Sequence, residues 1–256
     1  MKILGSDYDG TLNAGGIGEA KISAIQKWRK KGNKFGIITG RNGTFRDTLL
    51  EKYPQLECDF FATCNGGYIM DGEGNIIYEA RCNSVSLSSL VKDLFDWGVK
   101  YVCIIVGKKL MWVISTTEDK PQYAPKQDSF LLVDIPDVEY FNQISLSVSD
   151  SYEASLLTEK IKKYYGQWLN PLQNGKSIDV VSVGVNKAQG IYRVMELFNG
   201  DYNDVIVVGD NINDTDMLRE FYSYAMENSI EQVRNCADRV VRDVTELLEK
   251  ELADKS

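Results

Sequence analysis

Short apolar segments alternate with helix-patterned segments at both ends of this chain, and this rhythm restricts the fold more than any other feature of the sequence. In the N-terminal part, strand-like runs alternate with helical periodicity at residues 1–6, 19–31, 34–39, 42–53 and 59–63. In the C-terminal part the same rhythm runs through residues 187–198, 204–208, 214–221, 223–226 and 239–241, with a last helix from Asp243. Strands and helices that alternate at these intervals predict a parallel α/β sheet.

The middle of the chain follows another pattern. A helix at 86–97 is succeeded by strand-like runs at 101–106 and 110–115, which Gly107-Lys108-Lys109 separates as in a β-hairpin. A strand, a helix and a strand follow at 143–148, 152–165 and 177–183. We therefore predict an inserted α/β domain at residues 82–183, with an antiparallel sheet and two helices. It interrupts a core domain made of residues 1–81 and 184–256.

The composition narrows the possible chemistry. The chain of 256 residues has 43% hydrophobic and 26% charged residues, as ordinary globular proteins do. Its net charge of -8 argues against a nucleic-acid partner, because phosphate backbones are bound by clustered Lys and Arg. The chain has no histidine, which excludes Ser-His-Asp and Cys-His catalysis and every histidine metal site. The search for catalytic groups therefore centres on carboxylates.

The cysteines and the apolar segments indicate an ordinary intracellular protein. The five cysteines are scattered without a C-x-x-C pair, which predicts reduced thiols and neither a disulfide framework nor a zinc site. The first residues contain no signal-peptide hydrophobic stretch, and no apolar run approaches the length of a membrane span. We expect a cytoplasmic protein without a membrane partner. A monomer is compatible with the sequence, which carries no sign of the oligomeric state.

Four polar clusters stand just beyond predicted strands, where open parallel sheets bind their ligands. They are Asp7-Tyr8-Asp9-Gly10-Thr11, Thr39-Gly40-Arg41, Gly184-Val185-Asn186-Lys187 and Gly209-Asp210-Asn211-Ile212-Asn213-Asp214. An Asp is a good nucleophile toward a phosphoryl group held by a metal. A hydroxyl and free amides at a helix start suit phosphate oxygens, a lysine suits a phosphate, and an oxygen-rich loop suits Mg²⁺. Taken singly, each cluster also fits an ordinary turn, a helix cap or a solvated lysine.

The four clusters in this order resemble the haloacid dehalogenase-like (HAD) superfamily. The insertion between Gly67 and Gly184 looks like the large α/β cap of its class IIB, or Cof-like, subgroup. The segments that also match this subgroup are Asn65-Gly66-Gly67, Gly184-Val185-Asn186-Lys187 and Ala225-Met226-Glu227-Asn228. The resemblance implies a Rossmann-like core with a parallel sheet and an inserted cap domain of the C2, class IIB type. The chain departs from the family near its C-terminus, where the usual Asp-Gly pair is missing.

The resemblance also implies roles for individual residues. Asp7 is expected to be the nucleophile and Asp9 the general acid–base. Mg²⁺ would be held by Asp7, the Asp9 carbonyl and Asp210, with Asp214 supporting them. The phosphate would be bound by Thr39, the Gly40 amide, Lys187, Asn213 and the backbone at Tyr8.

These roles predict a Mg²⁺-dependent phosphatase for small phosphorylated metabolites. Sugar phosphates are the first expectation, ahead of phosphorylated cofactors such as FMN or pyridoxal phosphate. The carboxylate at position 9 favours hydrolysis, and the polar segments 116–129 and 167–177 of the cap are expected to set specificity. Two alternatives remain: a phosphomutase of the phosphomannomutase type and a non-catalytic sensor of phosphometabolites. A dinucleotide-binding oxidoreductase is excluded because no G-x-G-x-x-G follows the first strand.

Overall fold

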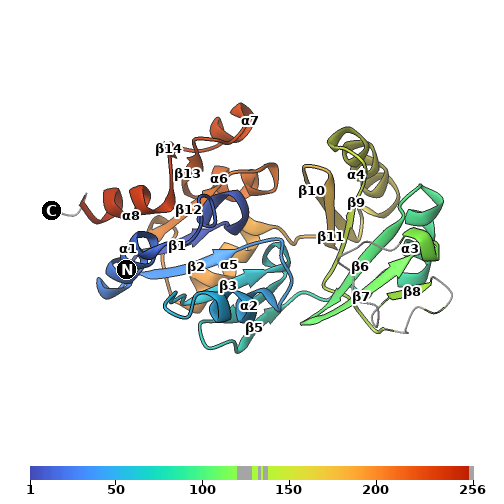
Figure 1. Ribbon diagram of the computed structural model, residues 1–256, viewed down its shortest axis with the longest axis horizontal. Coiled ribbons are helices and arrows are strands. Elements are labelled where there is room, and N and C mark those ends of the chain that lie inside the picture. The colour runs from blue at the N-terminus through green and yellow to red at the C-terminus, as the bar shows by residue number, and fades with distance from the viewer. Residues whose placement is uncertain (120–128, 132–133, 135–137, 254–256) are drawn as a thin grey trace. The chain divides into compact units, whose positions relative to one another are not determined.

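The computed structural model describes residues 1–119, 129–131, 134 and 138–253 and divides into two compact units. Unit 1 consists of Met1–Tyr78 and Asn186–Ser256, and unit 2 is the segment Glu79–Val185 between them (Figure 1). In the sequence, the boundaries are predicted after residue 81 and before residue 184. The assignment of these units to a catalytic core and a specificity cap stays a prediction.

Unit 1 is built on an eight-stranded sheet with the strand order β14-β13-β12-β1-β2-β3-β4-β5. Its strands from β14 to β3 are parallel, and β4 pairs antiparallel with β3. The bounds are β1 Ile3–Ser6, β2 Lys34–Ile38, β3 Phe60–Thr63, β4 Tyr68–Asp71, β5 Ile76–Glu79, β12 Val205–Gly209, β13 Tyr222–Met226 and β14 Arg239–Val241. The predicted parallel α/β sheet is confirmed.

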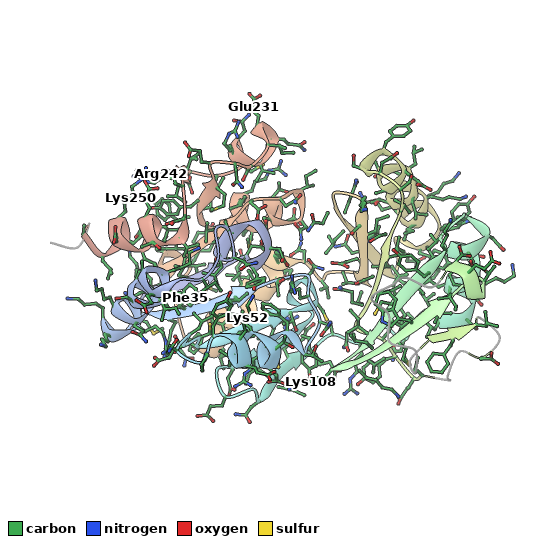
Figure 2. All side chains as sticks on the ribbon, viewed as in Figure 1. Phe35, Lys52, Lys108, Glu231, Arg242 and Lys250 are labelled. Carbon is green, nitrogen blue, oxygen red and sulfur yellow. The ribbon has the colours of Figure 1, made fainter. Side chains whose placement is uncertain are left out.

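Helices cover this sheet because its central strands are apolar on both faces, as in other parallel sheets. The helices are α1 Glu19–Lys30, α2 Phe45–Lys52, α5 Lys187–Leu197, α6 Thr215–Glu220, α7 Glu231–Arg234 and α8 Val244–Ala253. Ile191 and Val194 of α5 and Met217 of α6 pack against the strands in one hydrophobic core. Figure 2 labels Phe35, which is buried in unit 1, and charged residues that are exposed, such as Lys52 and Lys250.

A close approach between two glycines fixes the start of α5 relative to the sheet. A Cβ atom on Gly190 would lie 2.7 Å from Cα of Gly66 and 3.0 Å from Cδ1 of Ile38. Gly66 has φ +90° and belongs to the 3₁₀ turn Cys64–Gly66 that follows β3. Because both residues are glycines without side chains, α5 can lie directly on this turn. The contact is at Gly190, one helical turn after Lys187.

We predict that Gly190→Ala lowers the free energy of unfolding by about 1–3 kcal/mol, because overpacking outweighs the better helix propensity of alanine. Urea unfolding followed by circular dichroism measures this change. Gln189→Ala, at the exposed neighbouring position of α5, is the control and should shift stability by less than about 0.5 kcal/mol. Equal stability of the two variants would show that the glycine contact does not constrain α5.

Unit 2 is a six-stranded sheet with the order β10-β11-β9-β6-β7-β8. Its strands are β6 Tyr101–Val106, β7 Lys109–Ile114, β8 Ser129–Leu131, β9 Gln143–Ser147, β10 Leu169–Asn174 and β11 Ser177–Ser182. Within the described residues, neighbouring strands of this sheet pair antiparallel except β7 with β8, which pair parallel. The helices α3 Leu87–Asp96 and α4 Ser151–Tyr165 bury Leu90, Leu94 and Ile161 in one core with the sheet. Over the described residues, the two helices and the mainly antiparallel sheet agree with the prediction, whereas the parallel pair of β7 and β8 was not predicted.

The sequence predicts that residues 167–177 are a polar stretch joining elements of the inserted domain, and this prediction is wrong. They contain β10, which pairs antiparallel with β11 along its whole length. The segment Leu169–Asn174 contains Asn and Pro and reads as a loop, but an edge strand tolerates a proline because one side of it donates no ladder hydrogen bonds. Of the other proposed specificity segment, 116–129, residues 120–128 lie outside the described residues. The specificity role of both segments stays a prediction.

Two further expectations concern cysteines and membranes. All five cysteines are free thiols, and four of them are buried, as expected. In the described part of the chain, no helix is long and apolar enough to cross a membrane.

Candidate active site

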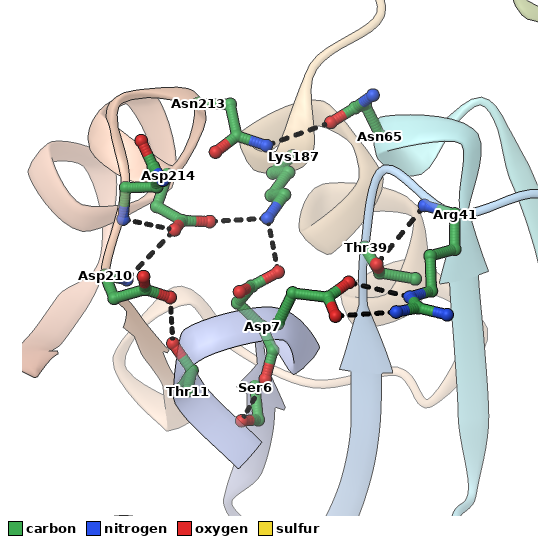
Figure 3. Close-up of polar contacts among 12 residues, drawn as sticks. Ser6, Asp7, Thr11, Thr39, Arg41, Asn65, Lys187, Asp210, Asn213 and Asp214 are labelled. Atoms are coloured by element: carbon green, nitrogen blue, oxygen red, sulfur yellow. Dashed lines mark hydrogen bonds and ion pairs between the residues drawn. The ribbon is translucent and has the colours of Figure 1, made fainter. Parts of the chain in front are cut away.

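Three of the four polar clusters meet at the edge of the unit 1 sheet where the parallel strands end (Figure 3). Asp7 follows β1 directly, Thr39 follows β2 and Asp210 follows β12. These strands are neighbours in the order β12-β1-β2, so their carboxyl ends deliver all three side chains to one place. Lys187, the first residue of α5, reaches the same place from the fourth cluster.

Lys187 is the centre of the site. Its Nζ donates hydrogen bonds to Oδ1 of Asp7 and to Oδ1 of Asp214, both at 2.6 Å. The three side chains are almost completely buried, with exposed fractions of 1% for Lys187, 7% for Asp7 and 0% for Asp214. Short charge-assisted hydrogen bonds of this kind are strong in a dry environment and fix the geometry of all three groups.

The loop after β12 holds Asp214 in place. The amides of Asp210 and Asn211 donate to Oδ2 of Asp214 at 3.0 and 2.9 Å. The other oxygen of this carboxylate is therefore aimed at Lys187. A Cβ atom on Gly209 would lie 2.5 Å from Cγ of Asp214, so the loop needs a glycine at this position. The G-D-N-I-N-D motif thus builds a rigid, buried carboxylate.

Asp210 approaches the turn that carries Asp9. The hydroxyl of Thr11 donates to Oδ1 of Asp210 at 2.6 Å. Gly10 has φ +80°, and a Cβ atom there would lie 2.3 Å from Oδ2 of Asp210. The segment Tyr8–Leu12 is a helical turn kinked at Asp9 and Gly10. Glycine at position 10 is required both by the backbone conformation and by the nearness of this carboxylate.

Asp9 forms a bidentate ion pair with Arg41 that the sequence did not predict. Nε and Nη2 of Arg41 donate to its two carboxylate oxygens, each at 2.7 Å. The guanidinium carbon lies 5.1 Å from the ring centre of Tyr8 and 5.3 Å from that of Phe45. Both charged side chains are 49% exposed. The stacked arginine orients the Asp9 carboxylate at the edge of the site.

The predicted phosphate-binding residues Thr39 and Asn213 are each held by a neighbouring residue. Thr39 is buried, and its hydroxyl accepts a hydrogen bond from the Arg41 amide at 3.2 Å. Asn213 donates through Nδ2 to Oδ1 of the buried Asn65 at 3.4 Å. Figure 3 shows Thr39 and Asn213 beside the Lys187–Asp7 contact. Gly40 lies in the turn after Thr39, whereas the Tyr8 ring packs edge-on against Phe45.

Negative charge exceeds positive charge in this cluster. Asp7, Asp210 and Asp214 each offer a carboxylate oxygen, and these oxygens lie within 4.8 Å of one another. Burial raises the pKa of Asp7 well above its usual value, although Lys187 opposes the shift, and burial likewise raises the pKa of Asp210. Burial alone would lower the pKa of Lys187, but Asp214 and Asp7 outweigh it and raise that pKa. Lys187 therefore stays charged, while the carboxylates lack a full counter-charge.

This donor set fits a hard divalent cation. Carboxylate and carbonyl oxygens are the protein ligands that Mg²⁺ takes, usually with water and substrate phosphate completing the shell. The oxygens of the cluster are close enough to share one ion, and the pKa shifts of Asp7 and Asp210 indicate that added positive charge would stabilise their ionised forms. The cluster can thus hold a metal beside the Asp7 carboxylate.

Comparison with known proteins decides the family. The family model of haloacid dehalogenase-like hydrolases matches residues 4–246. The chain belongs to this family. The 5-amino-6-(5-phospho-D-ribitylamino)uracil phosphatase YbjI of Escherichia coli K12 is 23% identical over 242 residues, covering 90% of this chain and 86% of YbjI. The enzyme of the same description in Bacillus subtilis 168, YcsE, is 23% identical over 243 residues, covering 94% of this chain and 89% of YcsE.

The solved structures agree with this fold. The HAD subclass IIB sugar phosphatase BT4131 superposes with a TM-score of 0.79 at 20% identity, covering 98% of this chain and 99% of that one. The predicted Cof-like HAD membership, the fold class and the expectation of an enzyme, a HAD-type phosphatase, are confirmed.

Sequence reasoning missed three residues of the site: Thr11, Arg41 and Asn65. Thr11 and Arg41 lie inside the D-Y-D-G-T and T-G-R motifs. The partner of Thr11, Asp210, is 199 residues away in the chain, and the partner of Arg41, Asp9, is 32 residues away. Nothing in a single sequence states such a pairing. The signal that could have found them was their position within motifs that meet at one sheet edge.

We predict that Lys187→Met, measured with chelator at pH 8, lowers the free energy of unfolding by about 3–5 kcal/mol, because it leaves buried carboxylates without a cation. The loss should be smaller at pH 5. A carboxyl group whose pKa is higher in the folded than in the unfolded protein stabilises the fold as pH falls, and burial already raises the pKa of Asp7 and Asp210. Lys27→Met, an exposed lysine of α1, is the control and should be nearly neutral. A loss independent of pH would contradict this electrostatic account.

Proposed function

We propose that this protein is a Mg²⁺-dependent phosphatase that transfers the phosphoryl group of a small phosphorylated metabolite to Asp7 before hydrolysis. The observation that carries the proposal is the contact of Lys187 with Asp7 and Asp214 beside Asp210. This contact supports the proposal because it brings a buried carboxylate, a fixed ammonium and further carboxylate oxygens together at one sheet edge. Asp7, the Asp9 carbonyl and Asp210 would hold Mg²⁺, and Asp214 would support them through the loop amides. When bound, Mg²⁺ would offset the repulsion between the carboxylates and an anionic phosphate.

In the first step, a carboxylate oxygen of Asp7 attacks phosphorus and the bond from phosphorus to the ester oxygen breaks. Asp9, which must first leave its ion pair with Arg41 and take up a proton, gives that proton to the leaving oxygen, so the alcohol departs neutral. Lys187 keeps Asp7 oriented and supplies a fixed positive charge in a buried site, where it acts more strongly than in water.

In the second step, a water molecule attacks the phosphorus of the aspartyl-phosphate and gives a proton to Asp9. The bond between phosphorus and Asp7 breaks, phosphate leaves, and both carboxyl groups return to their first state. Arg41 can pair with Asp9 while Asp9 is ionised, before it takes this proton, and so hold it at the edge of the site. The attack by water, in place of a second alcohol, is what makes the reaction a hydrolysis.

The remaining polar groups would bind the phosphate oxygens. Candidates are the Thr39 hydroxyl, the amides at Gly40 and Tyr8, Lys187 and the Asn213 amide. Thr39 and Lys187 are buried and already held by neighbours, so they would meet the phosphate with little loss of side-chain entropy.

For the substrate we propose a phosphate ester of a polyhydroxylated chain, with sugar phosphates first. Two relatives are phosphatases of a phosphoribitylamino compound, and a structure of the same fold is a sugar phosphatase. In this proposal unit 1 is the catalytic core and unit 2 the cap that sets specificity.

We predict phosphate release from p-nitrophenyl phosphate and from a panel of hexose, pentose and ribitol phosphates that requires Mg²⁺ and stops with chelator. Asp7→Asn should lose at least about 1,000-fold in kcat, because an amide is no nucleophile toward phosphorus. Asp216→Asn, an exposed carboxylate of α6 near the site, is the control and should keep most activity. A wild-type protein that releases no phosphate from any ester, or an equally active Asp7→Asn, would refute the proposal.

A second prediction tests the metal site without using activity. Saturating Mg²⁺ should raise the melting temperature of the wild type, and more at pH 8 than at pH 5, because protons compete with metal for carboxylates whose pKa values are raised. Asp210→Asn should lose this Mg²⁺-dependent rise, whereas Asp216→Asn should keep it. If Mg²⁺ stabilises Asp210→Asn as much as the wild type, Asp210 is not a ligand.

A further inference from the structure

Lys21 is a buried lysine that none of the roles above uses. It lies in the first turns of α1, and only 5% of its surface is exposed. Its Nζ donates hydrogen bonds to three backbone carbonyls, those of Leu12 at 2.7 Å, Ala14 at 3.0 Å and Gly16 at 3.1 Å. All three belong to the segment that connects the catalytic motif at residues 7–11 with α1.

A charged group in this setting is costly. Burial lowers the pKa of Lys21, and only the nearby charge of Asp243 opposes that shift. The hydrogen bonds of the ammonium go to neutral carbonyls. These three contacts and the charge of Asp243 offset the cost of removing the ammonium from water. The three carbonyl oxygens converge on the ammonium and need a hydrogen-bond donor there. Lys21 is that donor.

In the connecting segment, backbone hydrogen bonds already hold the amides of Leu12, Asn13, Ala14 and Gly16, and Lys21 binds the carbonyls of residues 12, 14 and 16. Gly15 and Gly16 have φ values of +68° and +85°, and a Cβ atom on either would meet no atom within 4 Å. Two consecutive glycines without packing contacts have a flexible backbone unless hydrogen bonds fix it. Lys21 supplies three of them from one point.

This fastening reaches the nucleophile through one residue. The amide of Leu12 donates to the carbonyl of Asp7 at 3.2 Å, and the carbonyl of Leu12 accepts from Lys21. The amide of Ala14 donates to the carbonyl of Thr11, whose hydroxyl binds Asp210. The turn that carries Asp9 is therefore closed at its far end by groups that Lys21 holds.

We propose that Lys21 is a positioning residue: its ammonium locks the segment of residues 12–16 so that the kinked turn holds Asp9 and Thr11 in register with Asp7. The inference rests on the proposed phosphatase function for its kinetic consequence, but not for its structural one. Without the ammonium, the three carbonyls lose their common donor and the turn loosens beside the nucleophile.

The test compares Lys21→Met, which keeps the apolar stem, with Lys27→Met, an exposed lysine on the same helix. We expect kcat to fall about 10- to 100-fold in Lys21→Met, the range that a misplaced catalytic group produces. The inhibition constant of inorganic phosphate should change less than about twofold, because Thr39, Lys187 and Asn213 lie outside the segment. Ile25→Val, a core change in α1 that costs about 1 kcal/mol, controls for lost stability and should keep kcat.

Chemical rescue distinguishes the loss of the ammonium group from a general disturbance of the fold. Lys21→Ala supplemented with n-propylammonium, which replaces the missing carbons and nitrogen, should regain kcat saturably, whereas n-butanol should not. Hydrogen exchange at the amides of Leu12 and Asn13 should be faster in Lys21→Met than in the wild type. The inference would be overturned if the wild type is active and a folded Lys21→Met has the same kcat and the same hydrogen exchange as the wild type. If the wild type itself is inactive, the proposed function fails, and the exchange measurement alone decides the role of Lys21.

Discussion

The buried ammonium of Lys187 is the contact on which the rest of the site depends. It joins Asp7, 180 residues earlier, to Asp214, 27 residues later. The contact is possible because β1 and β12 are neighbours in the sheet and because α5 starts directly on the turn after β3, where Gly66 and Gly190 touch. The fold thus serves to bring one lysine from a helix start between two carboxylates from strand ends.

The same cluster links stability to function. Three carboxylates around one ammonium are unfavourable in a buried place, which is visible in the raised pKa values of Asp7 and Asp210. A site built only for stability would not carry this excess of negative charge. A site that must take a divalent cation and then a phosphate has a use for it, because the cation supplies the missing charge. Lys187 and Lys21 act differently: one compensates side-chain charge, and the other fastens backbone carbonyls.

Much of this architecture could be read from the sequence. The buried strands around Val207, the helix starts and the order of the four polar clusters were sufficient for the parallel sheet, the inserted unit and the meeting of Asp7, Lys187 and Asp210. What the sequence could not provide were pairings between distant residues. Arg41 with Asp9 depends on the relative placement of two loops, and Lys21 with three carbonyls depends on backbone conformation. The strand β10 was missed because its polar, proline-containing sequence pairs only in the context of β11.

The central claim, that Asp7 carries the phosphoryl group, has one direct test. The protein is mixed with a ³²P-labelled phosphate ester and Mg²⁺, quenched in acid within one turnover and digested, and the labelled peptide is sequenced. Asp9→Asn should slow hydrolysis of the phosphoenzyme. With p-nitrophenyl phosphate, whose leaving group needs no protonation, this variant serves to accumulate it. The account predicts acid-stable, hydroxylamine-labile label on the peptide that contains Asp7, and none in Asp7→Asn. Steady phosphate release with no labelled protein, or label on another residue, would contradict it.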